Sequence, residues 1–215
     1  DLDFYIYEQL LRAMKRWKKA GKELFTISTN FSRRNFESGG KNFAGRLKRM
    51  ADHYGIDPKY IEVEVTESVV VENVDELKRV LSELEKFGFR IAIDDFGTGY
   101  SSLGVLLEIP ADVVKIDKSF TDRINLKEQR NFVSQMGNFI HSAKEEVIFE
   151  GIETEEQLQF LRGCGSCVSA QGSGTPDRLY QRCGVEKHGG IHLPLFPQRS
   201  AHCAERLVAE PPVHG

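Results

Sequence analysis

The sequence predicts an α/β fold of the (β/α)8 barrel type, with parallel strands and right-handed connections. Short runs rich in β-branched residues alternate with amphipathic helical segments up to about residue 172, and the connections between them are short, as in parallel α/β proteins. Polar residues follow the strand runs, as expected where strand ends share one mouth. No Gly-x-Gly-x-x-Gly follows a first strand, which disfavours a dinucleotide-binding fold.

The elements of the first half follow from the spacing of apolar residues and from glycine stops. In order, they are a helix from Phe4 to Trp17 that Gly21 ends, a strand over residues 24–30, a helix over 43–54 that Gly55 ends, and a strand over 61–66. The last of these is rich in β-branched residues, which favour strands.

The helix that begins after Asn73 is the clearest in the sequence. Asn73 is a suitable N-cap, and Glu76 three residues later completes a capping box. Its apolar stripe is Val74, Leu77, Leu81 and Leu84, and Gly88 ends it. The elements expected beyond it are strands over residues 89–93 and 112–116, a helical stretch over 119–144 with a break near Asn125, a strand over 147–149, and a helix through Leu161 capped by Thr154 with Gln157.

Polar side chains gather where these strands end: Asn30, Glu64, Glu67, Asp94, Asp95, Lys115, Asp117, Glu150 and Gln171. In a barrel they would share one mouth. The set contains carboxylates, amides and one lysine but no histidine or cysteine, which suits Mg²⁺ or Mn²⁺ and not Zn²⁺. Two such ions can activate a water and hold a phosphodiester, and a free carboxylate can take the proton of that water.

Asp94 and Asp95 form the sharpest pair in this set. Neighbouring strand residues point to opposite sides, but at a strand end the chain turns and both can reach the mouth. Two adjacent carboxylates repel each other unless a cation lies between them. Gly97 and Gly99 allow a tight loop that can approach a phosphate or a partner chain.

Six segments in order resemble the motifs of EAL domains: Thr29–Ser32, Glu64–Ser68, Asp94–Leu103, Lys115–Asp117, Glu150–Thr154 and Gln171–Gly172. The resemblance implies hydrolysis of cyclic di-GMP to linear pGpG with Mg²⁺ or Mn²⁺, often by a homodimer. By motif, the implied metal ligands are Asn30, Glu64, Asp94 and Asp95, the lysine at the attacking water is Lys115, and the general base is Glu150.

The resemblance also assigns supporting roles. Glu67 resembles the glutamate that anchors the loop beginning at Asp95, and Asp117 and Gln171 resemble residues that position water or ligands. The loop residues that would face the substrate or a dimer partner are Phe96, Gly97, Thr98, Gly99, Tyr100 and Ser101. Family members are commonly joined to an upstream sensor or diguanylate cyclase (GGDEF) domain.

The chain departs from the family pattern in lacking a Glu-Ala-Leu motif. In the family that motif supplies a metal-binding glutamate on an early strand. We therefore expect residues 1–172 to be a partial EAL domain whose barrel lacks a first strand and its closing elements, with impaired activity. The alternatives are a catalytically inactive domain that binds cyclic di-GMP or a protein partner, and a defective fragment that folds only in part.

Residues 173–215 differ from the rest, with five of the seven prolines and four of the six histidines. We expect an irregular tail, disordered or produced by a frameshift, because a shifted reading frame can encode the Phe-Trp-Tyr-Ser-Arg-Pro run expected after Gly172. A rival interpretation is a zinc site made from the late Cys and His residues: Cys164, Cys167, Cys183, His188, His192, His202 and Cys203. Their later spacing fits no standard zinc pattern.

Composition limits the other function classes. The net charge of −3 over 215 residues disfavours binding to nucleic-acid polymers or anionic membranes. No apolar run approaches the roughly 20 residues of a membrane span, and no secretory signal is evident. All four cysteines lie after residue 163. These features predict a cytoplasmic domain, with a parent protein that can be membrane-tethered.

Each site residue also has a structural interpretation. Asp94 and Asp95 could cap a helix, Asn30 could cap a turn, and Lys115 could form a surface ion pair. Glu150 and Glu153 could be acidic residues at a helix N-terminus, where the helix dipole favours them. Glu64 and Glu67 could be solvated charges at a strand end. Glu62 we interpret as a solvated charge near a strand end.

Overall fold

The computed structural model describes residues 2–36, 42–72, 74–99, 103–122, 124, 127–143, 146–163 and 168–171. The predicted cap Asn73, the loop residues Tyr100 and Ser101, all four cysteines and the tail over 173–215 lie outside this part. The strands are β1 (Ile27–Asn30), β2 (Ile61–Thr66), β3 (Arg90–Phe96), β4 (Val113–Ile116), β5 (Glu146–Glu150) and β6 (Val168–Gln171). The α-helices are α1 (Leu2–Lys19), α2 (Phe43–Tyr54), α3 (Glu67–Glu72), α4 (Val74–Lys86), α5 (Leu103–Glu108), α6 (Lys118–Thr121), α7 (Lys127–Ala143) and α8 (Glu155–Gly163).

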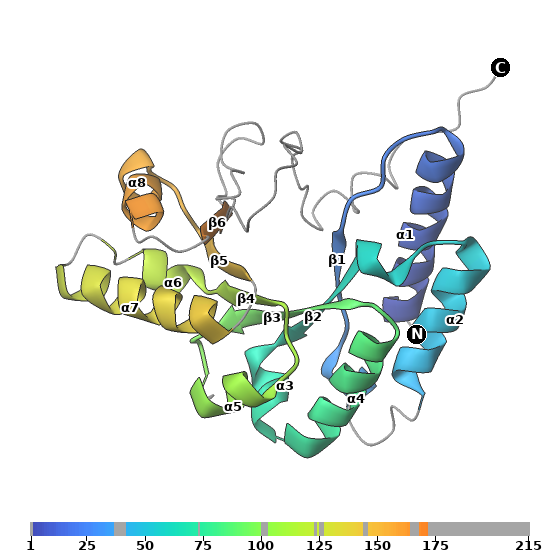
Figure 1. The fold of residues 1–215 in the computed structure, drawn as a ribbon, viewed down its shortest axis with the longest axis horizontal. Coiled ribbons are helices and arrows are strands. Elements are labelled where there is room, and N and C mark those ends of the chain that lie inside the picture. The colour runs from blue at the N-terminus through green and yellow to red at the C-terminus, as the bar shows by residue number, and fades with distance from the viewer. Residues whose placement is uncertain are drawn as a thin grey trace.

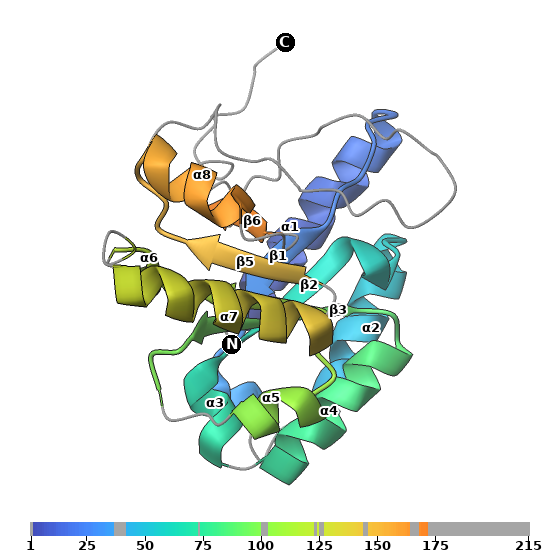
Figure 2. The same cartoon turned by 60° about the vertical axis from the view of Figure 1, so that its left-hand side comes forward.

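The strands form one six-stranded parallel sheet in the order β1-β2-β3-β4-β5-β6. The helices lie along the outer side of this curved sheet (Figures 1 and 2). Strands that lie in the sheet in their chain order, with the helices on one side of the sheet, form the wall of a barrel. A doubly wound sheet has a different strand order and helices on both sides. Within the described ranges β1 and β6 pair only with β2 and β5, so this part is an open segment of a barrel.

Strand alternation separates the core from the site. In β2, Val63 and Val65 belong to the apolar cluster that also contains Leu77 and Leu81 of α4. Because successive side chains of a strand point to opposite faces, Glu64 lies on the inner face of the sheet. Both faces of a parallel sheet are buried, so any polar side chain on the inner face must be paired. The site described below supplies these partners.

An aromatic cluster joins α1 and α2 to the end of β1. The ring of Phe31 lies 6.1 Å from that of Phe4 and 5.1 Å from that of Phe43, measured between centroids. Tyr7 is fully buried beside them and donates a hydrogen bond to the carbonyl of Leu47 at 3.3 Å. Tilted aromatic contacts of this kind add to the free energy gained by burial. They hold the end of β1, where Asn30 lies, against α1 and α2.

Most predicted elements are confirmed. The bounds expected for the second helix and second strand agree with α2 and β2, and the break near Asn125 falls between α6 and α7. The capping box of α8 is present: Thr154 Oγ1 accepts from the Gln157 amide at 3.2 Å, and Gln157 Oε1 accepts from the Thr154 amide at 2.9 Å. No helix within the described ranges is long and apolar enough to cross a membrane.

Three expectations were wrong. The first strand begins at Ile27 and not at residue 24, and β3 continues to Phe96 beyond the predicted end at 93. Glu62 is buried, with 7% of its surface exposed. It accepts a hydrogen bond from Ser28 at 2.7 Å and faces Arg90 at 3.4 Å, because strand pairing places all three residues on the inner face.

Candidate active site

The carboxyl ends of β2, β3, β4 and β5 bring four predicted residues together. Glu64 and Lys115 each stand between two apolar residues that face the helices, so alternation turns both inward. Asp94 pairs in register with Thr66, the last residue of β2. Glu150 ends β5. Residues separated by up to 86 positions, Glu64 to Glu150, therefore share one side of the sheet.

Lys115 and Glu64 form a buried ion pair, with 8% and 3% of their surfaces exposed. Lys115 Nζ also lies 3.8 Å from Asp94 Oδ1. Burial acts to lower the pKa of Lys115, but the charges of Glu64 and Asp94 outweigh it and hold that pKa above its usual value. Lys115 is therefore a fixed positive charge beside the aspartates. Its ion pair with Glu64 holds that carboxylate next to the ammonium group.

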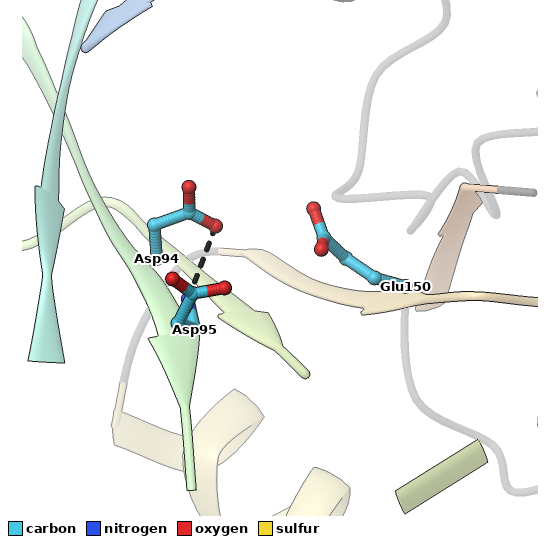
Figure 3. A group of neighbouring side chains, drawn as sticks. All are labelled: Asp94, Asp95 and Glu150. Carbon is cyan, nitrogen blue, oxygen red and sulfur yellow. Dashed lines mark hydrogen bonds between the residues drawn. The ribbon is translucent and has the colours of Figure 1, made fainter. Parts of the chain in front are cut away.

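Asp94, Asp95 and Glu150 form a second group, shown in Figure 3. One carboxylate oxygen of each lies within 4.8 Å of the others. Burial, followed by the charge of Asp94, raises the pKa of Glu150 to about 7. The same causes raise the pKa of Asp95. Three acids this close favour a proton or a cation between them, and oxygen ligands of this kind suit Mg²⁺ or Mn²⁺.

The chain turns sharply at Asp95, which lets both aspartates face the same side. Asp95 has a φ of 56°, in the left-handed region that Asp tolerates better than most residues. Its amide donates to Asp94 Oδ1 at 3.1 Å, and its carbonyl accepts from the Thr98 hydroxyl at 2.8 Å. These bonds hold the turn that follows β3.

Glu67, the first residue of α3, holds the loop after this turn. Its Oε2 accepts from the amides of Gly97 at 2.7 Å and Gly99 at 2.9 Å. Gly97 has a φ of 98°, and a Cβ there would lie 2.2 Å from the Phe120 ring. A side chain at this position would clash, so glycine permits the close approach of the loop to α6.

The remaining predicted residues stand at a neighbouring strand end, cap a helix or pack in the core. Asn30 is exposed at the end of β1, in register with Glu64. Asp117 caps α6, where its carboxylate accepts from the Ser119 amide at 2.9 Å. Phe96 is buried in the core. The backbone of Gln171 pairs with Glu150, and its side chain lies outside the described part.

Sequence reasoning missed Phe120 and Thr121, which support the site from α6. Phe120 packs against Gly97, and Thr121 Oγ1 lies 2.7 Å from the carbonyl oxygen of Glu150. Both lie within four residues after the Lys115–Asp117 motif, but an apolar and a hydroxyl residue in a short helix carry no functional signal in a sequence. Their contacts arise only when α6 packs under the ends of β3 and β5.

Comparison with known families agrees with this architecture. Residues 1–174 match the model of the EAL domain family. The chain belongs to the EAL domain family. It is 37% identical over 170 residues to the signaling protein YkoW of Bacillus subtilis, covering 76% of this chain and 20% of YkoW. It is 31% identical to the cyclic di-GMP phosphodiesterase NbdA of Pseudomonas aeruginosa, covering 80% of this chain and 22% of NbdA. This EAL chain thus spans about a fifth of the length of these curated relatives.

Solved EAL domains share the fold. The PaMucR phosphodiesterase in its cyclic di-GMP complex superposes with a TM-score of 0.69 at 30% identity, covering 78% of this chain and 67% of that one. The BlrP1 protein of Klebsiella pneumoniae, in a complex with manganese and cyclic di-GMP, gives a TM-score of 0.65 at 25% identity, covering 75% and 41%.

Proposed function

We propose that this EAL domain hydrolyses cyclic di-GMP to linear pGpG with Mg²⁺ or Mn²⁺. The observation that carries the proposal is the group formed by Asp94, Asp95 and Glu150, with ligand oxygens within 4.8 Å of one another. The charged Lys115 stands beside it at the same strand ends. Relatives named as cyclic di-GMP phosphodiesterases support the choice of substrate.

The residues of this chain have distinct proposed roles. Asp94, Asp95 and Glu150 fit a divalent cation, with Asn30 and Glu64 as further ligands. When bound, the cation would lower the pKa of the attacking water and offset the charge of the phosphate. Lys115 stabilises negative charge on the phosphate and orients that water.

Glu150 is the proposed proton acceptor. One of its carboxylate oxygens belongs to the group that would hold the cation, and the proposal assigns proton acceptance to the other. It takes the proton of the water as the water oxygen bonds to phosphorus, while the bond between phosphorus and the 3′ oxygen breaks and the 3′ oxygen takes a proton from solvent. Asp117 and Gln171 are proposed to position water.

Glu67 is proposed to set the loop that adjoins the substrate. Its Oε2 accepts hydrogen bonds from two backbone amides of that loop, so in this proposal the glutamate fixes the position of the loop without entering the reaction. The segment from Phe96 to Ser101 is proposed to face the substrate or a second copy of the domain.

The wider setting is also a proposal. We propose a cytoplasmic domain that can pair with a second copy and that is joined to an upstream sensor or diguanylate cyclase domain, as the relative MucR is named a bifunctional diguanylate cyclase and phosphodiesterase. The 215 residues contain no Glu-Ala-Leu motif. We therefore expect turnover by this polypeptide alone to be slow.

The test is incubation of the purified chain with cyclic di-GMP and Mg²⁺ or Mn²⁺, followed by chromatography of the nucleotides. We expect linear pGpG to accumulate slowly and only without EDTA. Calorimetry with cyclic di-GMP in Ca²⁺ or EDTA then separates a receptor from an enzyme. Binding without any turnover in Mg²⁺ or Mn²⁺ would favour the inactive receptor, and the absence of both would contradict the proposed substrate.

A further inference from the structure

The turn after Glu150 rests on α6 through one buried hydroxyl. Thr121 has no exposed surface. Its Oγ1 lies 2.7 Å from the carbonyl oxygen of Glu150 and 2.8 Å from that of Lys118, with the Gly151 carbonyl at 3.5 Å. The shortest of these contacts reaches the residue that carries the candidate base.

Gln157 holds the same turn from the other side. Its Nε2 donates to the carbonyl of Thr121 at 3.1 Å, and its Oε1 accepts from the amides of Glu153 at 2.8 Å and Thr154 at 2.9 Å. The side chain is buried, where such bonds are costly to leave unmade. Residues 150–154 are thus tied to α6 at one end and to α8 at the other.

The packing between α6 and the turn leaves no room for a side chain. Gly151 has a φ of 70°, and a Cβ there would lie 2.4 Å from the Lys118 Cβ and 3.2 Å from Thr121 Oγ1. The backbone at the end of β5 therefore cannot move toward α6, and the hydroxyl bond opposes movement away from it. Two opposite restraints fix the base of the Glu150 side chain.

We propose that Thr121 is a positioning residue that fixes the Glu150 carboxylate against Asp94 and Asp95. The inference rests on the proposed function, in which these three carboxylates hold a divalent cation. Thr121 does not touch the substrate or the cation; it acts through the Glu150 backbone. Because displacements of about 1 Å can cost a site much of its activity, loss of the hydroxyl should loosen the carboxylate group.

The test compares Thr121→Val, which has the same shape without the hydroxyl, with Thr121→Ser, which keeps the hydroxyl. Free Mn²⁺ is measured by electron paramagnetic resonance in titrations of each variant without nucleotide. We expect Thr121→Val to weaken Mn²⁺ binding about fivefold to tenfold, as the loss of one net hydrogen bond implies, and Thr121→Ser to stay within twofold of the wild type. In turnover, kcat should fall in Thr121→Val while KM for cyclic di-GMP changes little.

Ser142→Ala is the matched control, because the Ser142 hydroxyl donates to the Phe139 carbonyl at 2.7 Å on the exposed side of α7. It should bind Mn²⁺ like the wild type. If Thr121→Val does not fold, Gln157→Glu replaces it: this variant loses the donor to Thr121 but keeps the acceptor for residues 153 and 154, and should weaken Mn²⁺ binding about threefold.

Three outcomes would overturn the proposal. Wild-type Mn²⁺ affinity in folded Thr121→Val, or in Gln157→Glu where that variant replaces it, would remove the positioning role and leave the proposed function intact. Equal weakening in Thr121→Val and Thr121→Ser would show that the hydroxyl is not responsible. A wild-type chain that binds no Mn²⁺ would instead contradict the metal site itself, and with it both proposals.

Discussion

The inner face of the sheet carries two polar layers that solve the problem of buried charge differently. At the amino ends of the strands, Arg90 lies 3.4 Å from both Glu62 and Glu146, and Ser28 donates to Glu62. We call this set of four residues the floor. At the carboxyl ends, Glu64, Asp94, Asp95, Lys115 and Glu150 form what we call the mouth.

The difference lies in how the charges are compensated. In the floor one guanidinium lies between two carboxylates, and a hydroxyl completes the set. In the mouth the ammonium of Lys115 is paired with Glu64 and also lies 3.8 Å from Asp94, and the carboxylates of Asp94, Asp95 and Glu150 remain close together. Burial, followed by the charge of Asp94, raises the pKa values of both Asp95 and Glu150. A floor of this kind compensates its own charges, while the mouth groups three carboxylates to which we assign a cation in the proposed function.

The largest expected effect comes from Glu150→Gln in the mouth. Removing the proposed base should lower turnover of cyclic di-GMP by about 10²–10⁴-fold without unfolding the metal-free protein, because a repelling charge is lost. Turnover assays with circular dichroism would check both parts. Glu85→Gln, on the exposed side of α4, is the control and should act like the wild type. Full activity in Glu150→Gln would remove Glu150 from the mechanism.

Arg90→Met should break the floor. It leaves Glu62 and Glu146 without their guanidinium, which should lower the free energy of unfolding by about 2–3 kcal/mol, below the usual cost of a fully buried pair because part of Arg90 is exposed. Urea unfolding measures this loss. The control Arg79→Met removes an exposed pair with Glu76 on α4 and should cost under about 0.5 kcal/mol. Equal losses in the two variants would show that the floor contributes no more than a surface pair.

Glu67→Gln tests the loop beside the mouth. The amides of Gly97 and Gly99 would lose a charged acceptor but keep a neutral one, and charge-assisted bonds are roughly twice as strong as neutral ones. We expect turnover to fall about threefold to tenfold with little change in the unfolding midpoint. Steady-state kinetics would measure the fall; an unchanged kcat would mean that the loop needs no charged anchor.

The smallest effect is a pH dependence of stability in the metal-free protein. Glu150 ionises near its ordinary value of 4.5 when unfolded and near 7 when folded, so the folded state binds the proton more tightly. Its contribution therefore becomes unfavourable as pH rises from about 4.5 to about 7. Melting temperatures should fall by a few degrees more in the wild type than in Glu150→Gln over this range. Mn²⁺ should remove this destabilisation of the wild type above pH 7. Melting temperatures that change with pH in parallel in the wild type and Glu150→Gln without metal would contradict the prediction.

Local sequence features predicted the elements that depend on neighbouring residues. The capping box of Thr154 and Gln157 and the glycine after α2 are readable because their partners lie within a few positions. The predicted strand ends also placed Asp94, Lys115 and Glu150 on one edge. Strand boundaries at Ile27 and Phe96 were missed, since the ladder hydrogen bonds that define them belong to neighbouring strands.

The sequence by itself therefore determined the alternation of strands and helices, the order of the EAL motifs and the oxygen-rich character of the site. Only the tertiary structure decided which charges meet. Lys115 joins Glu64 across 51 positions, Glu62 turns into the floor and not into solvent, and Thr121 reaches the Glu150 backbone. These partners are set by strand register and helix packing, and a side chain acquires its electrostatic surroundings only when distant strands align.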